Sequence, residues 1–168
     1  MTAKVILSKN GHEMLADILK QEINDAAGRK ALEYACGRYS LAESLRDELD
    51  YIACTDKSAE LLETLKDKAG EKGIYLIPDD ELSEDCYFGR FHIVYTIFGF
   101  QGISHPVDEI LRLRRLLIKG GKIIIIDFSE NAFQEECIKQ LKRCGFSDIA
   151  VTAFLSDDKP AFKITAVK

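Results

Sequence analysis

Hydrophobic positions along the chain fall into two alternating patterns. Short apolar runs alternate with longer stretches in which apolar residues recur at helical spacing. The apolar runs predict strands at about 31–35, 50–55, 74–77, 91–98, 122–128, 148–155 and 161–167. The amphipathic stretches predict helices at about 10–27, 38–49, 58–72, 106–118 and 130–143. Strands that alternate with helices indicate a doubly wound α/β fold.

Polar residues and glycines mark the ends of the predicted helices. Asn10 and Glu13 have the spacing of a capping box, and Gly28 is a natural stop for the first helix. Ser58 starts the third predicted helix and Gly73 ends it. These signals agree with the hydrophobic periodicity.

The last two predicted strands are separated only by the turn SDDKP. So short a link cannot make a parallel crossover, so these strands must be antiparallel neighbours. The run Ile123 to Ile126 offers no polar alternation, which places its strand inside the sheet. The sequence therefore predicts a Rossmann-like, seven-stranded, mostly parallel sheet with one antiparallel strand.

Length and charge narrow the class of protein. A chain of 168 residues suits one domain, here residues 1–168 with a helical N-terminal segment at 1–29. The 23 basic and 28 acidic residues are spread along the chain and give a net charge of −5, which argues against a nucleic-acid surface. Arg112, Arg114 and Arg115 form the densest cationic run; a solvated helix face explains them better than a docking patch.

Cysteine spacing and hydropathy argue against metal-binding, disulfide-rich and membrane-spanning proteins. The five cysteines show neither metal-site nor disulfide-framework spacing, and only three histidines accompany them, so we expect no metal and mostly buried, reduced thiols. No apolar stretch approaches the 18 residues of a membrane span, and we see no signal peptide. We expect a cytoplasmic protein without a membrane partner.

The first two predicted strands and the helix between them outline a nucleotide-binding unit. Gly37 follows the first strand, and Asp56 follows the second strand 19 residues later. In such units, backbone N–H groups at the turn face the ligand and the acid accepts the ribose hydroxyls. Only one glycine of the usual cluster is present, so the turn is shortened or altered.

From about Ala31 to Lys168 the chain resembles the class I S-adenosylmethionine-dependent methyltransferases. Their first strand ends in E/D-x-G-x-G-x-G, and residues 33–39 read EYACGRY. Either Ala35 and Tyr39 replace the outer glycines, or two residues are deleted after Gly37. The family's acid and serine after the second strand match Asp56 and Ser58.

Later segments resemble the family in the same order. FHIV at 91–94 is similar to its F-D-x-V strand start, with histidine in place of the acid. EILRLRRLLIKGGKIIIIDF at 109–128 is similar to its helix, double-glycine turn and fifth strand. QLKRCGFSDIAV at 140–151 is similar to its closing helix, turn and sixth strand. The resemblance therefore implies the methyltransferase fold.

The resemblance also implies a set of site residues. The expected cofactor-binding residues are Glu33, Ala35, Gly37, Asp56, Lys57, Asp79 and Asp80. The expected acceptor-side residues are Tyr95, Phe98 and His105, with His105 also a weak candidate for a general base. Most of these residues also have a structural explanation. Glu33 and Gly37 could simply form a strand-to-helix turn, and Asp56 could cap a helix. Solvation could explain the aspartates after the third strand, and loop or core packing could explain the acceptor-side residues.

Three functions remain open. The first is methyl transfer from S-adenosylmethionine to a small-molecule acceptor, with S-adenosylhomocysteine as the product. The second is cofactor binding without transfer, and the third is loss of the cofactor and a role as an interaction module. A NAD-dependent oxidoreductase fits less well because the G-x-G-x-x-G fingerprint is absent. Little material is present for a lid, so we expect either a homodimer that covers residues 97–105 or weak activity.

Overall fold

The computed structural model describes residues 7–129 and 132–168, without the side chains of Tyr39, Lys68, Glu71 and Lys72. Its strands form one seven-stranded sheet in the order β3-β2-β1-β4-β5-β7-β6. β7 pairs antiparallel with both β5 and β6, and the other strand pairs are parallel, which confirms the predicted fold. The strands are β1 Lys30–Tyr34, β2 Tyr51–Thr55, β3 Tyr75–Leu76, β4 Phe91–Ile97, β5 Leu117–Phe128, β6 Ser147–Ser156 and β7 Lys159–Val167.

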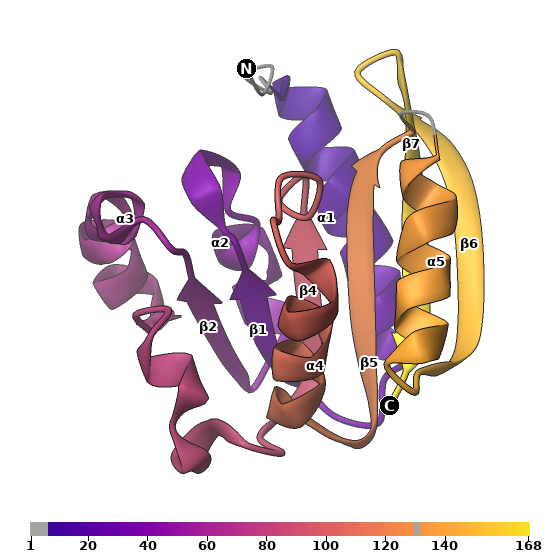
Figure 1. Cartoon of the computed structure of the whole chain (residues 1–168). Coiled ribbons are helices and arrows are strands. Elements are labelled where there is room, and N and C mark those ends of the chain that lie inside the picture. Colours follow the sequence, from indigo (N-terminus) through magenta and orange to yellow (C-terminus); the bar gives the residue numbers. More distant parts are fainter. Residues whose placement is uncertain (1–6, 130–131) are drawn as a thin grey trace.

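Helices cover both faces of the sheet, as Figure 1 shows. On the near face of that view lie α4 and α5, and α1 and α2 lie on the far face. The α-helices are α1 Lys9–Asn24, α2 Ala42–Leu45, α3 Ala59–Lys72, α4 Pro106–Leu116 and α5 Phe133–Arg143. The start predicted for the last helix, residue 130, lies outside the described residues. In the described part of the chain, no helix combines the length and apolar character needed to cross a membrane.

Two hydrophobic cores hold the layers together. Leu113 of α4 and Leu141 of α5 pack on one face of the sheet, and Leu19 of α1 and Leu45 of α2 pack on the other. The centre of β5 lies between β4 and β7 and contributes to both cores, and Ile125 is 0% exposed. The predicted interior position of this strand is therefore confirmed.

Both ends of α1 differ from the predictions, whereas the ends of α3 agree with them. Ser8, not Asn10, caps α1, because its hydroxyl accepts the N–H of Gly11. The helix ends at Asn24, before Gly28. Ser58 and Gly73 cap α3 as predicted, and Gly73 has the left-handed conformation that glycine tolerates best.

The helix predicted at 38–49 is broken. A 3₁₀ turn at Gly37–Tyr39 precedes α2, and a second one at Arg46–Glu48 follows it. The first of these turns, Gly37–Tyr39, follows the carboxyl end of β1. The parallel strands β1, β2 and β4 all end at the upper edge of the sheet in Figure 1. In open α/β sheets this edge is where ligands bind.

Candidate functional site

The turn after β1 has the backbone of a glycine loop. Ala35 and Gly37 both have φ of 55°, in the left-handed region that favours glycine. A Cβ added to Gly37 would meet no atom within 4 Å, so this residue faces open space. A ligand can therefore approach the backbone closely at Gly37, whereas the methyl group of Ala35 adds bulk to the same turn. The side chain of Tyr39 lies outside the described residues.

Asp56 connects this turn to the end of β2. Its Oδ2 accepts the N–H of Gly37 at 3.0 Å, and its Oδ1 accepts the N–H of Ser58 at 2.9 Å. The structure thus brings Gly37 and Asp56 together as the spacing predicted, and it also gives Asp56 a capping contact. Each carboxylate oxygen has a further lone pair, so Asp56 can still accept hydrogen bonds from two ribose hydroxyls. The residues at this end of the site fit S-adenosylmethionine.

Glu33 lies beneath the turn and is 1% exposed. Its carboxyl group accepts hydrogen bonds from the hydroxyl of Ser40 and from the N–H groups of Leu41 and Ala42, at 2.5, 2.9 and 3.2 Å. Burial raises the pKa of Glu33. These contacts make Glu33 a scaffold for the turn; direct contact with a cofactor stays a prediction.

A network of charged side chains lies beside Asp56 on the α4 side of the sheet. Arg112 pairs with Asp79 at 2.6 Å and with Glu109 at 3.0 Å, and Lys57 pairs with Glu109 at 2.9 Å. The hydroxyl of Tyr34 donates to Glu109 at 2.7 Å. We call these five residues the Arg112 network. It contains two of the predicted cofactor residues, Lys57 and Asp79, whereas Asp80 is exposed.

The solvated helix face predicted for the arginine run is wrong for Arg112. Its side chain is only 20% exposed because it lies against Asp79 and over the ring of Tyr34. Glu109 and Arg112 were not among the predicted site residues, although they pair with Lys57 and Asp79, which were. Their spacing of three residues, which places both on one face of α4, is the signal that the sequence offered.

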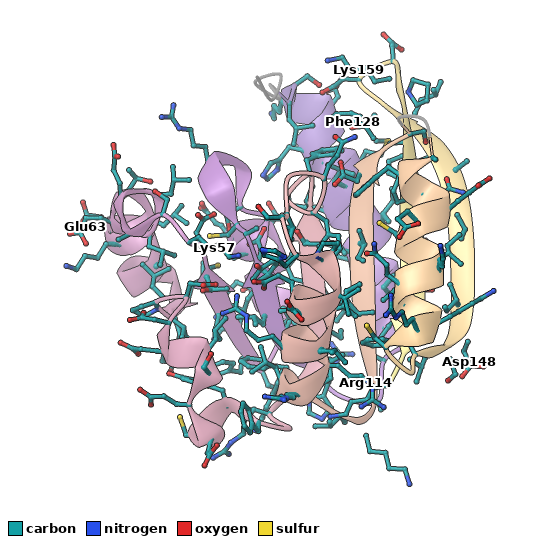
Figure 2. The ribbon with its side chains drawn as sticks, in the orientation of Figure 1. Lys57, Glu63, Arg114, Phe128, Asp148 and Lys159 are labelled. Atoms are coloured by element: carbon teal, nitrogen blue, oxygen red, sulfur yellow. The ribbon has the colours of Figure 1, made fainter. Side chains whose placement is uncertain are left out.

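The predicted acceptor residues lie in different surroundings. Tyr95 is 1% exposed, in the core on the α1 side. Phe98 has φ of 53° and stacks on Phe128, with ring centroids 4.1 Å apart. Lys159 lies 5.7 Å from the centroid of Phe128, and Figure 2 shows these two residues together at the upper end of the sheet. Exposed His105 occupies the N-cap position of α4, where its side chain makes no capping hydrogen bond.

Phe128 and Lys159 were not among the residues that the sequence analysis named, because the sequence does not show which side chains lie together at the end of a sheet. Among the described residues, no group of three or more histidine, cysteine, aspartate or glutamate side chains is placed to hold a metal ion. The chemistry that this edge offers is therefore hydrogen bonding by Asp56 and the Arg112 network, and aromatic contact by Phe98 and Phe128.

Solved structures share this fold. The YcgJ protein from Bacillus subtilis has a TM-score of 0.76 at 11% identity, covering 94% of this chain and 99% of its own. A SAM-dependent methyltransferase from Aquifex aeolicus has a TM-score of 0.75 at 14% identity, covering 96% and 99%. The [4+2]-cyclase SpnF has a TM-score of 0.78 at 15% identity, covering 93% and 80%. At these identities the likeness shows the fold alone.

Curated sequence relatives include two methyltransferases that are named for quinone compounds. The demethylmenaquinone methyltransferase of Staphylococcus saprophyticus is 26% identical over 129 residues, which are 74% of this chain and 55% of that protein. The ubiquinone biosynthesis O-methyltransferase of Erwinia tasmaniensis is 24% identical over 119 residues, 69% of this chain and 49% of that protein. The chain thus spans about half the length of these curated relatives.

A family model covers most of the chain. It is the model of the ubiE/COQ5 methyltransferase family, and it matches residues 2–144. The match includes the glycine turn, Asp56 and the whole Arg112 network. This chain belongs to the ubiE/COQ5 methyltransferase family.

Proposed function

We propose that this chain binds S-adenosylmethionine at the carboxyl ends of β1 and β2 and transfers its methyl group to a small-molecule acceptor. The observation that carries the proposal is the hydrogen bond between Gly37 and Asp56. It connects an open glycine turn to the carboxylate that we expect to bind the ribose hydroxyls. Membership of the family indicates S-adenosylmethionine as the cofactor, and solved neighbours from Aquifex aeolicus and Archaeoglobus fulgidus are SAM-dependent methyltransferases.

The residues have distinct roles in this proposal. When bound, the cofactor supplies a methyl group activated by its positively charged sulfur. Asp56 accepts the ribose hydroxyls, Gly37 allows close backbone approach, and Asp79 lies at the base end. Glu33 holds the turn in place through Ser40 and the start of α2. The main work of the protein is then to align the reactants and exclude water.

We propose a quinone-precursor ring as the acceptor. Curated relatives are named for ubiquinone and menaquinone biosynthesis. Phe98 and Phe128 support this choice, because their stacked rings provide a flat apolar surface at the ends of β4 and β5. His105 is the candidate for a general base where the acceptor must lose a proton.

Calorimetry with S-adenosylhomocysteine and a transfer assay with labelled S-adenosylmethionine test the proposal. Asp56→Ala should weaken nucleoside binding by about 1–3 kcal/mol, since it removes a charged acceptor. Asp47→Ala, at an exposed position in the 3₁₀ turn after α2, is the matched control and should leave the affinity unchanged. Equal affinity in wild type and Asp56→Ala would remove Asp56 from the site.

Binding without transfer is the second candidate, and the packing of Ala35 favours it. A Cβ added to Gly99 would lie 2.8 Å from the methyl group of Ala35, so this methyl closes the gap between the turn and the loop after β4. Tight nucleoside binding without methyl transfer in an acceptor screen would support this candidate. Ala35→Gly should then restore transfer; an inactive Ala35→Gly variant would remove the argument.

A further inference from the structure

Arg112 holds Asp79 more firmly than a single ion pair does. Its Nη2 lies 2.6 Å from Oδ1 and its Nη1 lies 3.2 Å from Oδ2. The same Nη1 donates to the main-chain carbonyl of Asp79 at 3.0 Å. A two-pronged guanidinium contact fixes the plane of a carboxylate as well as its position. The Asp79 side chain therefore cannot rotate without breaking two charged hydrogen bonds.

Arg112 is itself fixed by its neighbours. Its Nε donates to Glu109 at 3.1 Å, and its guanidinium lies 5.6 Å from the centre of the Tyr34 ring. Glu109 is in turn held by Lys57 and by the Tyr34 hydroxyl. These partners come from β1, from the segments after β2 and β3, and from α4, so the Arg112 network spans the edge of the sheet beside Asp56.

The network leaves Asp79 able to accept further hydrogen bonds. A carboxylate offers about four lone-pair sites, and the two N–H groups of Arg112 occupy two of them. The network contains two cations and two anions, so its formal charges balance without a ligand. A neutral N–H group can therefore donate to the remaining lone pairs of Asp79. A carbonyl oxygen placed there would meet a carboxylate that has no proton to donate.

We propose that Arg112 is a positioning residue that orients Asp79 to accept the exocyclic amino group of the adenine ring. The site should thereby prefer an adenosyl ligand to one with a 6-oxopurine base. This inference rests on the proposed function, because it concerns the base end of the same nucleoside site. Arg112 acts only through Asp79 and need not touch the ligand.

The test compares two nucleosides by calorimetry: S-adenosylhomocysteine and S-inosylhomocysteine, which carries an oxygen in place of the amino group. Wild type should prefer the adenosyl compound by about 10–100-fold, because a site built for a donor rejects an acceptor. Arg112→Met should reduce this preference to about threefold or less. Arg112→Lys should give an intermediate preference, since an ammonium group cannot make the two-pronged contact.

Arg115→Met is the matched control, because Arg115 lies on the same helix with an exposed side chain. It should keep the wild-type preference. If Arg112→Met instead weakens both nucleosides by the same factor, Arg112 is merely structural and the inference is overturned while cofactor binding stands. If wild type binds neither nucleoside, the proposed function fails and the inference fails with it.

A second variant keeps the inference falsifiable should Arg112→Met not fold. Asp79→Asn places an amide donor at the same position. It should shift the preference toward the inosyl compound, because the amide N–H can donate to its carbonyl oxygen. An unaltered adenosyl preference in Asp79→Asn would show that Asp79 does not contact the base, and the positioning role of Arg112 would be overturned.

Discussion

At the scale of single residues, Glu33 shows how one carboxyl group shapes the turn above it. The N–H groups of Leu41 and Ala42, where the helical segment begins, donate hydrogen bonds to this carboxyl group. Its position on β1 keeps it out of water, so the charged form is penalised. The consequence is a pH dependence of stability that a surface glutamate does not produce.

Because burial raises the pKa of Glu33 above its ordinary value of 4.5, the folded state binds this proton more tightly than the unfolded chain. The stability that Glu33 contributes is complete at pH below that ordinary value and declines as pH rises through the folded-state pKa. The melting temperature of wild type minus that of Glu33→Gln should therefore decrease as the pH rises above about 5.

Glu60→Gln, at an exposed position in the first turn of α3, is the control. Its difference from wild type should stay flat over the same interval. A flat difference for Glu33→Gln as well would contradict the direction of the pKa shift.

Site residues could be predicted only where a local pattern marks them. The hydrogen bond between Gly37 and Asp56 could be anticipated, because a strand, a turn, a helix and a second strand set the spacing of the two residues. The contacts of Arg112 could not be anticipated, because its partners Asp79 and Tyr34 lie 33 and 78 residues away in the sequence. Arginines that alternate with leucines on a helix fit a solvated face as well as they fit a charged network. Only the positions of Asp79 and Tyr34 in space distinguish the two.

At the scale of elements, the centre of β5 is the most demanding position for substitution. Ile125 pairs with Thr96 of β4 and Ile164 of β7 and is 0% exposed. Ile125→Asp should unfold the domain, because an unpaired carboxylate in this core costs more than about 4 kcal/mol. Leu155→Asp on the edge strand β6, where Leu155 is 60% exposed, should change stability by less than about 0.5 kcal/mol. Chemical denaturation of both variants measures the contrast.

The docking of α1 on the β6–β7 turn gives a second prediction. Asp157 accepts the main-chain N–H of Ser8 at 2.8 Å and also its hydroxyl. A Cβ on Gly11 would lie 2.6 Å from the Asp157 carboxylate, so Gly11→Ala should displace this carboxylate and lower the melting temperature.

Gly70 is the matched control, because it also lies within a helix but its Cβ would meet no atom within 4 Å. Gly70→Ala should stabilise the protein by about 0.5–1 kcal/mol, since alanine favours the helix. Equal gains for both glycines would show that α1 does not depend on Asp157.

Strands were easier to predict than the helix after the first strand. Each buried strand is a continuous apolar run, and such runs indicate strands without knowledge of their neighbours. The break between the 3₁₀ turn and α2 was missed because the carboxyl group that accepts Leu41 N–H and Ala42 N–H lies on β1. Periodicity within residues 38–49 cannot reveal an acceptor outside them.

At the scale of the whole molecule, the described chain has no helix between β4 and α4, so the short loop at residues 98–105 supplies no lid over the proposed acceptor side. Catalysis by methyl transfer requires that water be excluded there. We therefore predict a homodimer whose second subunit covers residues 97–105, or slow turnover on a small acceptor. Light scattering combined with a transfer assay measures both, and a monomer with tight cofactor binding and rapid turnover would contradict this prediction.

The position of β7 has a consequence for synthesis of the chain. This strand comes after β6 in the sequence yet lies between β5 and β6 in the sheet. The edge of β5 that pairs with β7 therefore stays without its partner while about 40 more residues are made, roughly 2–8 s at elongation rates of about 5–20 residues per second. During that interval the nascent chain presents an unpaired strand of four consecutive isoleucines, which is a target for chaperones and for pairing with other chains.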